Sequence, residues 1–297
     1  MAVKKHTLSR LRRQEAAWSY AFLLPAFLTI LVFVFIPVIN ACWISLHKWS
    51  MFGDMEWVGL GNYTYWLKND EWLGTLKKTL RYVVMYIPTL FCTSLMLALI
   101  VKHIRKGTGF FRTAYFMPIV LSATASGIVW KLLFDQKAGA INKIIKLMGG
   151  SSLPWLGRGQ YAIWAALIVH VWMQAGYYMV IFYAGIQDIP RDYYEAAEID
   201  GATGWNAFRY ITFPCLANTS VFVLIMSAIN SFQAFDQVKM LTNGGPAYAT
   251  RFAVHHIYEN AFQLYDMGGS SAMAIILFVI ILAVSILQLK VTGQTNK

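Results

Sequence analysis

Neutral polar side chains recur inside two long apolar runs of this 297-residue sequence. In the first run, His170, Gln174 and Tyr177 are spaced four and three residues apart, which places them on one face of a helix. Met173 lies beside that face, and the second run contributes Ser227, Asn230, Ser231 and Gln233. Neutral donors and acceptors near aromatic rings suit a hydroxyl-rich solute such as a sugar. The alternative is hydrogen bonding between helices, worth only about 1 kcal/mol per bond.

Acidic side chains are concentrated in a third segment, between the two polar runs. Five of the chain's 14 acidic residues fall within 13 positions: Asp188, Asp192, Glu195, Glu198 and Asp200. Pro190 and the acids around it predict the start of a short helix, and Gly201 predicts its end. Ala196 and Ala197 add almost no bulk, so a partner could approach closely, and Glu195 offers a carboxylate to a basic residue. The alternative is a solvated acidic loop.

The composition indicates a membrane protein. Hydrophobic residues make up 58% of the chain, charged residues 13%, and the mean hydropathy is +0.49. The net charge of +11 is better explained by anionic lipid headgroups and basic cytoplasmic loops than by nucleic acid. Cys42, Cys92 and Cys215 lack metal-ligand spacing and predict neither a metal site nor a disulfide framework.

The apolar runs predict an all-α integral membrane protein, a six-transmembrane-helix bundle in a single domain over residues 1–297. The expected spans are about 17–47, 80–101, 113–134, 160–187, 211–235 and 267–290. The acidic segment then occupies the loop 188–209 between the fourth and fifth spans. We expect local kinks at Pro25, Pro37, Pro88 and Pro118. The first run is too long for a cleaved signal peptide, because no charged residue occurs between Glu15 and Lys48.

Basic residues set the expected orientation. The amino-terminal residues and the loop 102–112 are rich in lysine and arginine, so both are predicted to be cytoplasmic. Alternation then places the loop 188–209 and the carboxyl terminus in the cytoplasm as well. The loop 131–158 opposes this bias, because it should be external yet holds five basic residues and one acid. Residues 137–148 and 252–262 predict short helices at the membrane surface.

The acidic segment resembles a known signature. The order Glu195-Ala196-Ala197, three residues, Gly201, nine residues and then Ile211-Thr212-Phe213-Pro214 matches the motif of permease subunits of binding-protein-dependent ABC importers. Phe213 replaces the usual leucine and is the one departure. The stretches 20–25, 110–118 and 241–246 are similar to the sugar-importer branch, of the maltose and glycerol-phosphate type, and to the first of its two non-identical permeases.

The resemblance implies partners and a location. A second homologous permease, two ATPase subunits and an extracellular solute-binding protein would complete the complex in a bacterial or archaeal cell membrane. Glu195, Ala196, Ala197, Asp200, Gly201 and Pro214 would belong to the coupling helix that enters the ATPase. The sequence contains no G-x-x-x-x-G-K-[S/T], so ATP and magnesium are expected on the partner ATPase, with no cofactor and no catalytic site in this chain.

Three alternatives to an ATP-driven carbohydrate importer remain open from the sequence. The signature is shared by importers of other solutes, such as glycerol phosphate. An ion-coupled secondary sugar transporter usually needs ionisable residues at mid-membrane. The charge-free segments within the predicted spans, 16–47, 82–101, 113–130, 159–187, 210–235 and 267–289, contain no Asp, Glu, Lys or Arg. His170 as a lone proton relay has little support without an intramembrane carboxylate. A membrane-embedded enzyme would need a catalytic pair or metal cluster, and no predicted span contains one.

Overall fold

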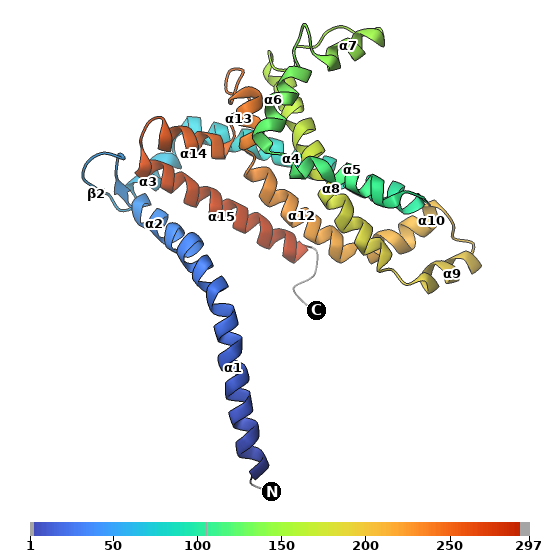
Figure 1. Cartoon of the computed structure of the whole chain (residues 1–297). Coiled ribbons are helices and arrows are strands. Elements are labelled where there is room, and N and C mark those ends of the chain that lie inside the picture. The colour runs from blue at the N-terminus through green and yellow to red at the C-terminus, as the bar shows by residue number, and fades with distance from the viewer. Residues whose placement is uncertain (1–2, 105, 292–297) are drawn as a thin grey trace. The chain divides into compact units, whose positions relative to one another are not determined.

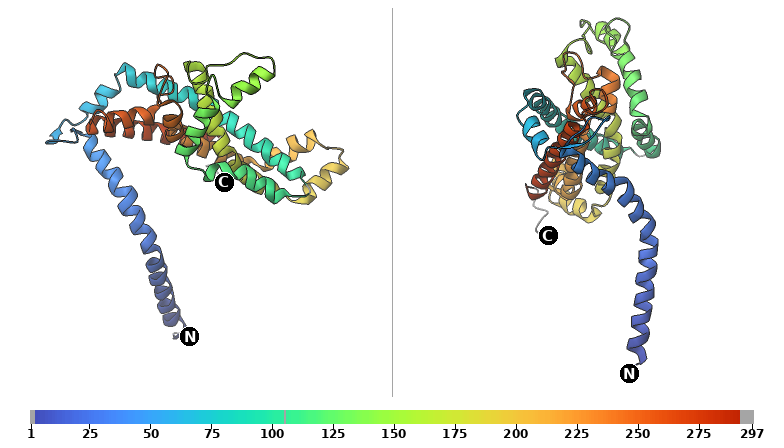
Figure 2. Two further views of the ribbon diagram at one scale, coloured as in Figure 1. Left: turned by 45° about the horizontal axis from the view of Figure 1, so that its top comes forward. Right: turned by 90° about the vertical axis from the view of Figure 1, so that its left-hand side faces the viewer.

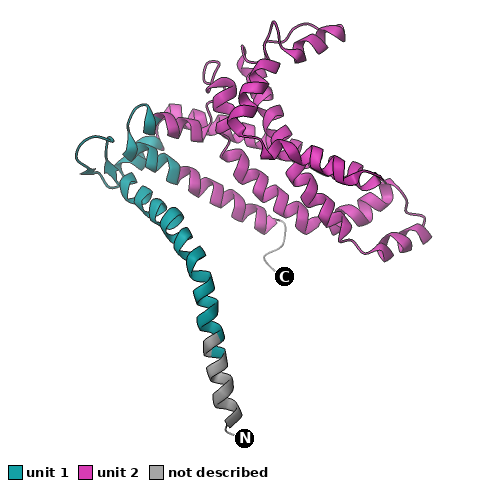
Figure 3. Ribbon diagram, viewed as in Figure 1, with its two compact units in different colours: residues 1–66, 260–275 teal, residues 67–259, 276–297 magenta. Residues whose placement is uncertain are grey.

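The computed structural model describes residues 3–104 and 106–291, and the chain divides into two compact units (Figure 3). The first unit comprises residues 1–66 and 260–275, and the second comprises residues 67–259 and 276–297. The first unit contains α1 (Val3–Ile30), the π-helical turn η1 (Leu31–Phe35), α2 (Ile36–Ser45), β1 (His47–Lys48), β2 (Glu56–Trp57) and α3 (Gly61–Trp66). The two strands pair antiparallel, with His47 opposite Trp57.

The second unit holds most of the helices (Figure 1). In chain order these are α4 (Asp70–His103), α5 (Thr108–Val120), α6 (Ala123–Leu133), α7 (Ala140–Leu147), α8 (Gly159–Gln187), α9 (Arg191–Ile199), α10 (Trp205–Ala207), η2 (Phe208–Thr212), α11 (Phe213–Cys215), α12 (Ala217–Phe232) and α13 (Asp236–Thr242). The helices α14 (Ala253–Phe262) and α15 (Met267–Val291) each contribute residues to both units. The predicted surface helices at 137–148 and 252–262 are thus α7 and α14.

Four of the predicted spans are continuous helices long and apolar enough to cross a membrane: Glu15–Ser45, Asp70–His103, Gly159–Gln187 and Met267–Val291. The other two are broken. The third bends by 98° between α5 and α6, and the fifth bends by 68° between the helix ending at Cys215 and α12. Each break follows a proline, Pro118 or Pro214, which removes a backbone donor. Within the described residues, four to six segments are therefore long and apolar enough to cross a membrane, and six spans stay a prediction.

Two prolines also explain the two π-helical turns. Pro37 follows η1 and Pro214 follows η2, each by two residues. A proline ring clashes with the carbonyl four residues earlier, so the helix widens by one residue there. At both turns an amide donates to the fifth carbonyl back, from Ile36 to Leu31 and from Phe213 to Phe208.

Helix α8 is the centre of the second unit and packs beside α4 and α5 (Figures 1 and 2). Its core positions carry large side chains such as Tyr178, Met179 and Phe182, all fully buried. Gly176 permits the close approach of α5, because a Cβ there would lie 1.7 Å from the carbonyl oxygen of Tyr115. This packing fixes the face of α8 that carries His170 and Gln174.

Candidate functional site

A polar cavity of about 200 Å³ lies in the second unit, where α8, the end of α12 and the start of α13 meet. It is lined by Ala123, His170, Met173, Gln174, Asn230, Gln233, Ala234, Phe235, Asp236 and Gln237. Ligand sites usually enclose about 300–1,000 Å³, so this cavity is smaller than a complete site for a drug-sized ligand. Five of the eight residues singled out in the two apolar runs are brought together here: His170, Met173, Gln174, Asn230 and Gln233.

His170 is held in a fixed orientation by two tyrosines of α4. Its Nδ1 lies 2.9 Å from the Tyr82 hydroxyl, and its ring stacks on Tyr86 with the centroids 4.2 Å apart. The side chain is buried. Because Nδ1 is already engaged, Nε2 is the ring atom left to hydrogen-bond a solute. A donor or acceptor held this firmly loses little conformational entropy on binding.

Asn230 and Met173 complete the α8–α12 side of the cavity. The Asn230 amide nitrogen donates to the Tyr178 hydroxyl over 2.7 Å, which joins α12 to α8. Its side-chain carbonyl is therefore the group oriented away from this bond and able to accept a hydrogen bond from a hydroxyl. Met173 is buried at the wall and supplies apolar surface beside Gln174.

Tyr177, Ser227 and Ser231 do not line the cavity. The Ser227 hydroxyl donates to the Leu224 carbonyl oxygen over 3.0 Å, and the Ser231 hydroxyl donates to that of Ala228 over 2.8 Å. Both serines are fully buried. Tyr177 packs against the hydrophobic core next to Tyr178. Their predicted contact with solute stays a prediction, with the serine hydroxyls already bonded to their own helix.

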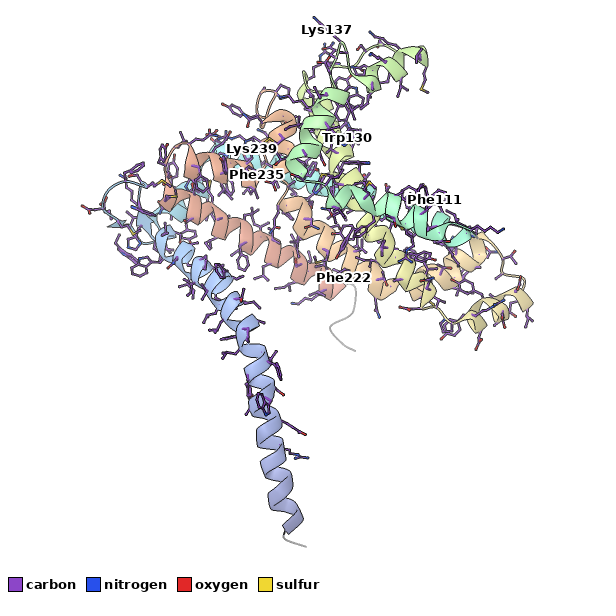
Figure 4. All side chains as sticks on the ribbon, in the orientation of Figure 1. Phe111, Trp130, Lys137, Phe222, Phe235 and Lys239 are labelled. Carbon is purple, nitrogen blue, oxygen red and sulfur yellow. The ribbon has the colours of Figure 1, made fainter. Side chains whose placement is uncertain are left out.

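The sequence reasoning missed the segment after α12 as a cavity wall. Phe235 supplies an aromatic face, and Asp236 and Gln237 supply a carboxylate and an amide. Phe235 also lies 5.1 Å from the Tyr258 ring, and the Lys239 ammonium group is 5.3 Å from the Phe235 ring (Figure 4). The available signal was the cluster of amide, aromatic and acidic residues at the end of the fifth apolar run, residues 233–237.

The acidic segment forms α9, a nine-residue helix that begins after Pro190. Gly201 ends it with a φ of +76°, a left-handed conformation that favours glycine. The amide of Ala202 then donates to the Ala197 carbonyl over 2.8 Å, which satisfies one of the last carbonyl groups of the helix. The local sequence therefore explains both ends of α9.

The predicted coupling residues differ in exposure. Glu195, Ala196, Asp200, Gly201 and Pro214 are exposed, whereas Ala197 is buried. Ala197 is therefore covered by this chain itself, and contact of Ala196 with a partner stays a prediction. Glu195 forms a 3.0 Å ion pair with Arg191 one turn earlier, with both side chains exposed. Such a pair is worth about 0.3–0.5 kcal/mol, so it can be exchanged for a partner's basic residue.

No group of three His, Cys, Asp or Glu residues that could hold a metal ion occurs among the described residues.

The chain is similar to membrane components of binding-protein-dependent transport systems. The family model described as "Binding-protein-dependent transport system inner membrane component" matches residues 57–292. The trehalose/maltose transport system permease protein MalF of Thermococcus litoralis is 34% identical over 284 residues, covering 95% of this chain and 96% of the relative. The sn-glycerol-3-phosphate permease protein UgpA of Agrobacterium fabrum is 32% identical, covering 91% and 93%.

A solved structure shares the fold. A chain of a bacterial ABC transporter involved in the import of the acidic polysaccharide alginate superposes with a TM-score of 0.84 at 20% identity. The match covers 97% of this chain and all of that chain.

Proposed function

We propose that this chain, which belongs to the family of binding-protein-dependent transport system inner membrane components, moves a carbohydrate across the cell membrane by alternating access. The observation that carries this proposal is the polar cavity, in which His170, Gln174 and Asn230 meet. These neutral groups can donate to and accept from sugar hydroxyls, and Phe235 can cover the apolar face of a sugar ring. The relatives named for trehalose, maltose and arabino-oligosaccharides support the same solute class.

A phosphorylated solute fits this cavity less well. A phosphate group is usually held by arginine, lysine or backbone amides. The lining residues that the structure describes include no lysine or arginine, and they include the carboxylate of Asp236. Glycerol phosphate would therefore meet like charge in the part of the site contributed by this chain. A neutral sugar meets no such repulsion.

The size of the cavity supports a second permease as partner. About 200 Å³ is too little for a disaccharide, so a homologous permease would supply the facing half of the site. In this proposal the chain forms one transmembrane domain of six spans, with α5–α6 and α10–α12 as the broken ones. Both termini and α9 are cytoplasmic, α9 enters one of two ATPase subunits, and an external binding protein delivers the solute.

In the proposed cycle, α9 is the helix that the ATPase moves. ATP binding closes the two ATPases, moves the coupling helices and opens the bundle outward, and hydrolysis resets it inward. In the sequence, α9 lies between α8 and the span that ends in α12. Residues of both α8 and α12 line the cavity. Movement of α9 therefore acts on helices on both sides of the solute.

The complex purified with its ATPases and binding protein tests this function. We expect ATP hydrolysis to rise several-fold when the binding protein carries a neutral sugar, with maltose, trehalose and arabino-oligosaccharides as probes and glycerol phosphate as the comparison. Stimulation by glycerol phosphate alone would contradict the proposed solute class. Sugar uptake that requires an ion gradient and no ATP would contradict the ATP-driven mechanism.

A further inference from the structure

The side chain of Tyr194, in α9, contacts two other elements. Its hydroxyl lies 2.9 Å from the Thr212 hydroxyl at the end of η2. The ammonium group of Lys102, in the last turn of α4, donates to the same hydroxyl over 3.3 Å and lies 4.4 Å from the centre of the tyrosine ring. One side chain therefore joins α9, the end of α4 and the start of the fifth span.

The bond to Thr212 closes the loop that carries the sequence signature. Tyr194 precedes Glu195, and Thr212 lies between Ile211 and Phe213 in the second part of that signature. Thr212 is buried, and its hydroxyl also approaches the Ala207 carbonyl oxygen at 3.5 Å. This hydrogen bond thus joins the residue directly before the first part of the signature to the second part, 18 positions later.

The contact to Lys102 connects α9 with the helix that holds His170. Lys102 lies in the last turn of α4, whose Tyr82 and Tyr86 hold the His170 ring. Helix α4 is continuous between these residues, with Pro88 inside it, so both sets of contacts belong to one helix. The same helix therefore contacts α9 at one end and a cavity residue further along.

We propose that Tyr194 is a positioning residue that transmits the movement of α9 to α4 and to the span containing α12. The inference rests on the proposed function, in which the ATPase moves α9. Tyr194 itself need not contact the ATPase, because its hydroxyl and ring are occupied by contacts within this chain. Loss of these contacts leaves α9 able to bind the ATPase and removes the link to the cavity helices.

Hydrogen–deuterium exchange of the purified complex, with and without ATP plus vanadate, tests this link. In the wild type we expect the nucleotide to change exchange in α9, in residues 99–103 of α4 and in η2. In Tyr194→Leu and Thr212→Val the change in α9 is expected to persist, while the change in the other two segments falls to less than half. Thr212→Ser keeps the hydroxyl and is expected to restore the response.

The neighbouring residue supplies a matched control. Tyr193 is on the same helix, and its side chain is 53% exposed, so Tyr193→Leu is expected to behave as the wild type. Thr212→Val and Lys102→Gln each remove one contact of Tyr194, which keeps the test valid if Tyr194→Leu does not fold. Wild-type exchange responses in Tyr194→Leu, Thr212→Val and Lys102→Gln would overturn the inference.

The wild type separates this inference from the proposed function. If the nucleotide changes exchange in α9 but not in α4 or η2, the link through Tyr194 is wrong and the coupling role of α9 stands. If α9 does not respond and the ATPase does not co-purify, the proposed function is wrong and the inference fails with it.

Discussion

At its first turn α4 meets a buried arginine from the segment before α14, whereas at its last turn it meets exposed α9 through one tyrosine. Arg251 is buried and forms ion pairs with Glu71 of α4 and Glu259 of α14. The His255 Nε2 lies 3.6 Å from the Glu259 carboxylate. At the other end, roughly 45 Å away along the helix, the charges of α9 are exposed.

Hydrogen bonds reinforce the arginine end. The Thr79 hydroxyl oxygen accepts from the Ala253 amide over 2.9 Å, and the Thr75 hydroxyl lies 3.1 Å from the His256 Nδ1. The Lys78 ammonium group donates to the Tyr248 carbonyl oxygen over 2.9 Å. This end is therefore built as a fixed connection, whereas the charges of α9 remain available to a partner. The ion pairs of the buried Arg251 hold two elements of this chain together, whereas the exposed pair of Arg191 and Glu195 can be replaced by a pair with a partner.

Replacing one arginine at each end gives the largest expected effect. Arg251→Met leaves the mostly buried carboxylate of Glu259 without its arginine partner, whereas the Glu71 side chain is 61% exposed. The free energy of unfolding should fall by about 3 kcal/mol, the low end of the range for breaking a buried pair. Arg191→Met breaks the exposed pair with Glu195 and should cost at most about 0.5 kcal/mol. Thermal unfolding of the purified protein in detergent measures both. Equal losses of Tm would contradict the contrast between the two ends.

The second-largest effect is expected from acid, which should destabilise the end of α4 that packs against Arg251 and His256. Burial, with the positive charge of Arg251, lowers the pKa of His256 from 6.5 to about 4. The unfolded chain then binds more protons than the folded chain between these values, so stability is full above pH 6.5 and falls as the pH drops toward 4. The loss is at most about 3 kcal/mol. We expect Tm to fall over this range, and to fall less in His256→Gln. An identical slope in that variant would remove His256 from the explanation.

Changes at the exposed end should affect binding more than folding. Glu195→Lys reverses a charge that a basic partner would clamp, and Gly201→Asp places a side chain at a φ of +76°. We expect each to weaken ATPase attachment about tenfold, equivalent to roughly 1.4 kcal/mol, while the protein still inserts. Co-purification with the ATPase measures this.

Gly201→Ala serves as the control for Gly201→Asp. It introduces a Cβ at the same backbone conformation and adds no charge, and the space around Gly201 is open. We expect it to retain more ATPase than Gly201→Asp. Undiminished attachment in both Glu195→Lys and Gly201→Asp would show that α9 does not couple to the ATPase.

The apolar runs predicted where the helices lie, but they did not predict which of these helices are broken. The run 113–134 contains no charge at the point where α5 and α6 separate, so composition alone did not reveal the bend of 98°. Pro118 indicated a kink, but its size depends on the packing of α6 against α13, which the sequence does not display. The short helix before Gly201 was predictable, because its start and end are local signals.

The cavity residues on α8 were predictable, because helical periodicity alone places them on one face. The cavity residues beyond Gln233, after the end of α12, were not. His170 and Gln174 share a face of α8 and do meet at the cavity. Phe235 and Asp236 follow α12, which ends at Phe232, and the sequence does not show that this segment lines the same cavity as His170. Ser227 was ambiguous in another way, because a serine hydroxyl can donate to its own helix, as it does here.

The last comparison is between two residues that line the cavity and two serines that bond to their own helix, and neither pair of substitutions is expected to disturb the fold. His170→Ala with Gln174→Ala removes two groups that line the cavity, so we expect uptake to fall at least about tenfold while the ATPase stays attached. Ser227→Ala with Ser231→Ala removes two hydroxyls bonded to their own helix and should change uptake less than about twofold. Uptake of labelled sugar into vesicles containing the complex measures both. Unchanged uptake in the first variant would assign His170 and Gln174 to packing, and a large loss in the second would place the serines in the solute path.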